Sequence, residues 1–488
     1  MQLFILALFI GVHAEELLAH GLAEAWLPWN LRGWSMLAVV AIPKLLLAAA
    51  YALACVLTLK QLSRRSVRRP LRRLERFTAL YRWAGLIAFY FDLTIGGLEA
   101  LRQATGATIF LNELFIILPP LAMLMWSWWC YYPIDRWIRN AQLISRIDEG
   151  LPVYPVWSRR QYMVAQLRYQ VALLFVPLAL LLALSQTIEE HVPNRVQMIP
   201  FDPRPALQLC GAGCIFLLAP VMIRHLWNTL PLPAGPLRNH LAQMCARYRV
   251  GVRELLIWQT FGGMVNAAVM GLISPFRYIL LSDALLEMVS PREVEAVMAH
   301  ELAHVCRRHM VWLIGSTVAL MAASAAVGWT IIAVITKVVI ACSPELTPGW
   351  TLPNTDALMM GVSIVGWLLG FGWISRRFER QADAFAVRHL SISGALPDLP
   401  VSSIKVDKAS AMTMVNALEQ VCRLNNLDRS GRSWRHGSIR WRQQYLRSLV
   451  GHHVNTLTID RQVFWIKFVT AVLLVAAITA AILPLASS

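Results

Sequence analysis

The sequence predicts a mainly α-helical integral membrane protein with several spans and an α+β domain set between them. Of its 488 residues, 57% are hydrophobic and the mean hydropathy is +0.52, which is too apolar for an ordinary soluble protein. Apolar segments long enough to cross a bilayer alternate with short blocks of arginine and lysine. The second half also contains polar stretches with helix and strand patterns, which indicate a folded domain.

The distribution of charge favours a membrane partner over a nucleic acid. A net charge of +17 is also found in nucleic-acid-binding proteins. Here the basic residues lie in short blocks beside apolar segments, which is the pattern of cytoplasmic loops in membrane proteins. We therefore expect the lipid bilayer, and no nucleic acid, as a partner. The eight cysteines are scattered without a C-x-x-C pair, so no disulfide framework is predicted.

Residues 1–223 are predicted to form an N-terminal membrane region. The first apolar segment, 2–14, is short and has no basic residue before it, so we expect a first membrane helix and not a cleaved signal peptide. An arginine-rich block over 64–76 is expected to stay in the cytoplasm, and the other orientations follow from it by alternation. Further spans are predicted at about 36–58, 79–99, 107–130, 168–186 and 206–223.

The second half places two polar stretches on one side of the membrane. They are 224–310 and 376–462, the predicted first and second parts of a single domain. Between them, 311–375 contain two spans, at 312–341 and 357–375, and 463–488 contain a last one. The loop from Cys342 to Asp356 has no Lys or Arg, as expected outside. Because two crossings return the chain, both polar stretches are predicted to be cytoplasmic.

The stretch from Ser290 to His304 predicts a helix that carries metal ligands. Ser290 suits the N-cap, and Glu293 completes a capping box. On such a helix His300 and His304 lie one turn apart on the same face, where two imidazoles can bind one cation. Glu301 then lies beside the metal and can take a proton from metal-bound water, so it is the candidate general base.

A second helical pair downstream offers the remaining ligand. Glu379 and Asp383 are four residues apart. Glu379 completes a His-His-Glu set that leaves the fourth position to water, as in catalytic zinc sites. Asp383 can accept the outer N–H of a ligand histidine and fix its tautomer. A solvated charged helix is the alternative, but together the two motifs favour one Zn²⁺ per chain, bound by His300, His304 and Glu379.

H-E-L-A-H at 300–304 followed by E-R-Q-A-D at 379–383 resembles the M48 metallopeptidases, the group of bacterial heat-shock membrane proteases and eukaryotic CAAX-processing proteases. The resemblance covers roughly 252–446. Asn266-Ala267 resembles the family's substrate-binding edge strand, and His436 to Arg442 resembles its closing element beside the active site. This chain has Gly437 where the family usually has Pro.

The resemblance implies a zincin-like α+β catalytic domain. Short strands are predicted at 254–259, 265–270 and 277–281. Asn266 and Ala267 are expected on an edge that adds substrate backbone as an extra strand, with an ordinary strand as the alternative. The resemblance makes His436 and Arg442 candidates for stabilising the oxyanion, against the alternative of surface residues in a basic tail.

Other ionisable residues receive no catalytic role. The spacing of His309 and His389 does not place them in a four-coordinate site, so both are interpreted as structural. Lys44, Asp92 and Glu113 lie in or near apolar spans, where ionisable groups face the protein interior or pair locally.

Together these observations predict an integral membrane zinc endopeptidase. Its substrates are expected to be proteins or peptides near the cytoplasmic face, and its location a bacterial inner membrane. The alternative protease is a signalling enzyme of the antirepressor-sensor type, which also places a H-E-x-x-H domain among membrane helices. A catalytically idle membrane scaffold is the alternative of another class, and the intact set of Glu301 with its neighbouring ligands argues against it.

The predicted topology can be tested with two single cysteines in a cysteine-free background. A cysteine at Thr347 is expected to react with an impermeant thiol reagent on intact cells, because a loop without Lys or Arg crosses readily. One at Ser433, among arginines, is expected to react only after the membrane is opened. The opposite order of labelling would overturn the orientation. Labelling of both sites from outside would contradict the predicted number of spans, and with it the argument that the two motifs share one zinc ion.

Overall fold

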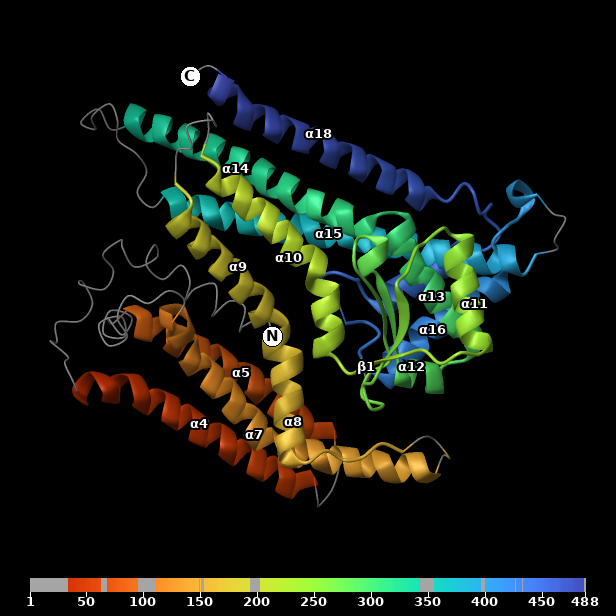
Figure 1. Cartoon of the computed structure of the whole chain (residues 1–488), viewed down its shortest axis with the longest axis horizontal. Helices are drawn as coiled ribbons and strands as arrows, with labels where there is room; N and C mark the ends of the chain where they lie inside the picture. Colours follow the sequence, from red (N-terminus) through yellow and green to blue (C-terminus); the bar gives the residue numbers. More distant parts are fainter. Residues whose placement is uncertain are drawn as a thin grey trace. The chain divides into compact units, whose positions relative to one another are not determined.

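The computed structural model describes residues 34–62, 68–94, 111–148, 150, 153–193, 202–342, 355–395, 400–425, 427–431 and 433–486. The chain divides into two compact units, Met1–Trp227 and Asn228–Ser488 (Figure 1). The predicted segment 2–14 and most of the loop Cys342 to Asp356 lie outside the described residues.

In the part of the first unit that the structure describes, all regular secondary structure is helical. Its α-helices are α4 (Trp34–Leu62), α5 (Arg68–Thr94), α7 (Leu111–Asp148), α8 (Arg159–Gln166), α9 (Leu173–His191) and α10 (Arg204–Leu226), with a π-helical turn, Leu167–Ala172, between α8 and α9. Tyr51 and Tyr81 are buried between α4 and α5, and the Tyr81 hydroxyl donates to the Met123 carbonyl at 3.0 Å. Lys44 pairs with Asp92, so these two ions satisfy one another.

Four helical segments among the described residues are long and apolar enough to cross a membrane. They are 41–62, 204–226, 309–342 and 458–480, and the bent pair 159–172 and 175–191 adds a fifth if it is one span. These segments correspond to five of the predicted spans. The predictions at 79–99, 107–130 and 357–375 coincide with α5, α7 and α15 (Thr355–Ser393), and their crossing stays a prediction. The protein is therefore a mainly helical integral membrane protein.

The second unit contains a four-stranded sheet in the order β1-β2-β4-β3. The strands are β1 (Thr229–Pro231), β2 (Glu254–Trp258), β3 (Ala267–Met270) and β4 (Tyr278–Ser282). β2 and β4 are parallel, and the other two pairings are antiparallel. The three predicted strands are confirmed to within two residues at each end, and β3 lies at an edge, as expected. β1 was not predicted, because three residues ending in proline give too short a pattern.

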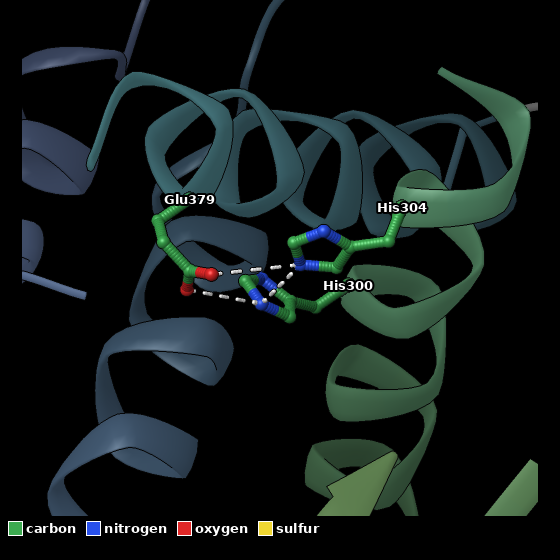
Figure 2. A group of neighbouring side chains, drawn as sticks. All are labelled: His300, His304 and Glu379. Carbon is green, nitrogen blue, oxygen red and sulfur yellow. Dashed lines mark hydrogen bonds and ion pairs between the residues drawn. The ribbon is translucent and has the colours of Figure 1, made fainter. Parts of the chain in front are cut away.

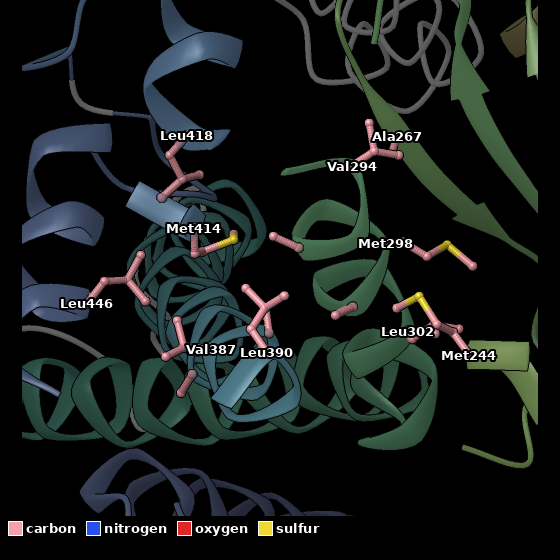
Figure 3. Packing of buried hydrophobic residues seen from close by; sticks show 14 of the residues in the cluster. Met244, Ala267, Val294, Met298, Leu302, Val387, Leu390, Met414, Leu418 and Leu446 are labelled. Atoms are coloured by element: carbon pink, nitrogen blue, oxygen red, sulfur yellow. The ribbon is translucent and has the colours of Figure 1, made fainter. Parts of the chain in front are cut away.

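Helices cover this sheet, and some of them extend into the apolar segments. They are α11 (Pro236–Arg247), α12 (Asp283–Met288), α13 (Pro291–Cys306), α14 (His309–Cys342), α15, α16 (Lys408–Leu424), α17 (Ile439–Ser448) and α18 (Thr458–Ala486), with 3₁₀ turns at Ser274–Phe276 and Val401–Ser403. α13 begins with the predicted capping box at Ser290 and Glu293. Figure 3 shows the buried core between β3, α13, α15, α16 and α17, with Leu302, Leu390 and Leu446 among its members.

Two helices run from the domain into apolar segments without a flexible linker. α15 passes from the predicted span at 357–375 straight into the stretch that carries Glu379, with no break at the predicted boundary. α14 begins three residues after α13 ends, and α14, α15 and α18 lie side by side (Figure 1). The positions of the motif residues are therefore tied to the apolar helix bundle.

Candidate metal centre

Three side chains from two helices converge on one point. His300 and His304 come from adjacent turns of α13, and Glu379 reaches them from α15 (Figure 2). The two Nε2 atoms are 3.3 Å apart, and Glu379 oxygens lie 3.6 Å from Nε2 of His300 and 3.8 Å from Nε2 of His304. Four-coordinate zinc with bonds of 2.0–2.1 Å needs ligand atoms about 3.4 Å apart. This donor set therefore fits a zinc ion.

A buried carboxylate and a buried guanidinium lie behind these side chains. Asp383 is fully buried, and its Oδ1 lies 3.0 Å from Nδ1 of His300. Arg442 of α17 donates to both oxygens of Asp383, at 2.8 Å from Nε and 2.5 Å from Nη2. Its Nη1 lies 3.4 Å from Glu379. The guanidinium thus pairs with both carboxylates of α15 and fixes the distance between them.

The pKa values of the two histidines are shifted in opposite directions. Burial lowers the pKa of His304 to about 4, and the neighbouring His300 adds to this effect. In His300, burial acts in the same direction but is outweighed by Asp383 and Glu379, which raise its pKa to about 9. His304 is therefore neutral near pH 7, whereas His300 has to release a proton when its Nε2 takes a cation.

Glu301 lies beside the three converging side chains in a cavity of about 420 Å³. Burial raises the pKa of its carboxyl to about 7, while His300 and the backbone N–H of Val269, which donates to the carboxylate, lower it. A carboxyl that titrates near neutrality is suited to both accepting and returning a proton. The same cavity is lined by Asn266 and Ala267, so the predicted edge and the predicted base face one space.

His436 lies at the mouth of this cavity. Its side chain is half exposed, and Nδ1 lies 3.1 Å from Glu379. The turn that presents it requires Gly437, whose φ is +75°. Proline is fixed near φ −65° and cannot take this conformation, and a Cβ at Gly437 would lie 2.9 Å from the Trp441 ring. The departure from the family's usual Pro therefore has a local structural reason.

The sequence indicates a structural role for His309, and in the structure His309 contacts the candidate ligand His304. His309 is fully buried, its Nδ1 lies 3.1 Å from Nδ1 of His304, and its Nε2 lies 2.9 Å from Oε1 of Gln381. The Gln381 amide donates to Asp460 at 2.5 Å. If His304 binds through Nε2, its Nδ1 carries the proton and donates to His309, which then donates to Gln381. His389 instead bonds to Tyr248 and Glu295, away from the centre.

This chain is similar to known proteins over the region that contains the candidate centre. Residues 258–406 match the family model described as Peptidase family M48. A protein of Arabidopsis thaliana named CAAX prenyl protease 1 homolog is 27% identical over 200 residues, which is 40% of this chain and 46% of that protein. Its namesake of Oryza sativa subsp. japonica is 27% identical over 207 residues, 40% of this chain and 45% of that protein.

The chain thus spans less than half the length of the curated relatives it matches. A solved structure described as "Crystal Structure of S. mikatae Ste24p" aligns with 86% of this chain and 100% of that chain, at 14% identity and a TM-score of 0.46.

The contact between His309 and His304 predicts an effect on metal affinity. His309→Phe fills the space but cannot accept the His304 proton, so we expect Zn²⁺ affinity to fall ~10–100-fold in competition with a chelator. His309→Asn retains an acceptor and is expected to recover part of the loss.

His389→Phe is the matched control, because His389 is equally buried but does not contact a candidate ligand. It is expected to change thermal stability and leave Zn²⁺ affinity near that of the unaltered protein. Unchanged affinity in His309→Phe would show that His309 does not support His304.

Proposed function

We propose that this chain, whose residues 258–406 match the model of Peptidase family M48, is a zinc-dependent endopeptidase of the membrane. It would hydrolyse peptide bonds of membrane-associated proteins or peptides near the cytoplasmic face. The observation that carries the proposal is the convergence of His300, His304 and Glu379 with Glu301 on one cavity along the edge of β3. A protein or peptide is the class of substrate that such an edge can bind.

His300, His304 and Glu379 would hold the ion. A bound zinc ion would supply Lewis acidity, which polarises a carbonyl and lowers the pKa of water. Glu301 would accept the proton of the attacking water and return it to the leaving amine. Its position against the Val269 N–H fixes the carboxylate toward the edge where the substrate backbone would lie.

The surroundings of Arg442 and His436 support different roles for them. All three guanidinium nitrogens of Arg442 lie against Asp383 or Glu379, which favours a role in holding these carboxylates over the oxyanion role that the resemblance implies. We therefore propose that Arg442 and Asp383 position the ligands. His436 has one ring nitrogen beside Glu379 and a half-exposed side chain at the cavity mouth, so it remains the candidate oxyanion donor.

The location is part of the same proposal. α14 and α18 are apolar enough to cross a membrane, and α15 carries Glu379 at the end of a largely apolar stretch. Substrates are therefore expected to reach the centre from the bilayer or its surface. The cytoplasmic orientation and the bacterial inner membrane follow from the expectations above, and the two cysteine positions test the orientation.

Replacement of Glu301 tests the catalytic assignment. Glu301→Gln retains the shape of the side chain but cannot accept the proton of water, so casein hydrolysis in detergent is expected to fall ~10²–10⁴-fold. Zinc content and thermal unfolding are expected to stay near those of the unaltered protein.

His304→Ala and a zinc chelator are the companion experiments, since each should abolish hydrolysis through loss of the metal. An idle scaffold would hydrolyse no casein in any of these preparations. Near-normal turnover in Glu301→Gln would remove this residue from the role of base.

A further inference from the structure

The peptide groups of β3 point alternately toward β4 and toward the open edge. Ser282 donates its backbone N–H to the Asn266 carbonyl at 2.9 Å, and the Asn266 N–H donates to the Ser282 hydroxyl. The backbone N–H and C=O of Asn266 therefore face β4. By alternation, the N–H and C=O groups of Val265, Ala267 and Val269 face the open edge. These three residues are the places where an added strand would pair.

At Val269 only the N–H is used, by the Glu301 carboxylate, and the carbonyl is left for a substrate. At Val265 a side chain takes both peptide groups. The Asn425 carboxamide accepts the Val265 N–H at 2.9 Å and donates to the Val265 carbonyl at 2.8 Å. It thus forms both bonds that a neighbouring strand would form with Val265. Asn425 is the C-cap of α16, and its own N–H bonds to the Val421 carbonyl, so the side chain is held by the helix that covers this end of the edge.

At the opposite end of the edge, a second cavity lies beside the strand. Beyond Val269 the chain turns at Gly271, whose φ is +99°. The cavity, of about 370 Å³, is lined by Val269, Gly271 and His304 together with Arg277 and Arg308. His304 and Val269 line both cavities, so the space along the edge continues past the candidate metal centre in this direction. The edge is therefore open at the Gly271 end and occupied at the Val265 end.

We propose that Asn425 ends the substrate-binding edge of β3, so that a bound peptide pairs only with Ala267 and with the carbonyl of Val269. The proposal rests on the proposed protease function. Val265 lies two residues from Ala267, about 7 Å along the strand. A substrate must therefore leave the sheet, or end, within about two residues on that side. On the other side it can continue into the second cavity, so cleavage would favour bonds near one end of an extended chain.

A scan of N-methylated peptides tests this limit on the unaltered enzyme. A substrate N–H that donates to Ala267 or Val269 is lost on N-methylation, and residues paired with these two positions lie two apart along the peptide. We expect two sensitive positions, each with kcat/KM reduced about tenfold. A third sensitive position two residues farther, on the Val265 side, would overturn the proposal.

The Asn425 variants give the converse test. Asn425→Ala frees the peptide groups of Val265, so a third sensitive position should appear opposite it. Asn425→Asp retains the size of the side chain and the acceptor for the Val265 N–H, so it should retain two. Asn455→Ala is the matched control, since the exposed Asn455 bonds to Arg388 away from the cavity. An Asn425→Ala profile equal to that of the unaltered enzyme would contradict the proposal.

The two hypotheses fail in different ways. If the unaltered enzyme cleaves no peptide in the series, the protease function itself fails. If it cleaves them but methylation gives the same pattern of sensitivity with and without Asn425, the function stands and the role of Asn425 is refuted. If Asn425→Ala does not fold, the scan of the unaltered enzyme still decides between two and three paired positions.

Discussion

The candidate centre depends on two carboxylates that are buried next to each other on α15. Glu379 and Asp383 are each nearly inaccessible to solvent, and ionised carboxylates are costly to bury without partners. Arg442 compensates both, since it bonds to Asp383 and lies against Glu379. Breaking such a buried pair typically costs ~3–5 kcal/mol, so α17 is required for α15 to present these groups to His300 and His304.

The same network joins the centre to the apolar helices. Glu379 lies on a helix that starts at Thr355, and His304 lies in the last turn of α13, which α14 follows directly. Behind His304, hydrogen bonds lead through His309 and Gln381 to Asp460 in the first turn of α18. The Lys467 ammonium of α18 donates to the Arg307 carbonyl at 2.7 Å. A shift of these apolar helices would therefore move candidate metal ligands directly.

Sequence reasoning identified features that depend on local spacing. The pairs at i and i+4 put His300 with His304 and Glu379 with Asp383 on single helix faces, and strand patterns located β2, β3 and β4. It also placed Glu379 and Asp383 beside the histidine helix, because the two motifs together are typical of one zinc site. It did not find contacts between distant residues that belong to no motif. Asn425 and Val265 are 160 residues apart, and neither has a residue type or spacing that indicates the pair. Arg442 was recognised through resemblance, but its commitment to Asp383 is visible only in three dimensions.

The central claim is that two imidazole nitrogens and one carboxylate oxygen of this chain bind a single zinc ion. X-ray absorption at the zinc edge of the purified, detergent-solubilised protein measures this set most directly. The account predicts one zinc per chain with only nitrogen and oxygen neighbours at about 2.0–2.2 Å, including the scattering of two imidazole rings. A sulfur neighbour at about 2.3 Å, from one of the eight cysteines, would contradict it, as would a shell without imidazole.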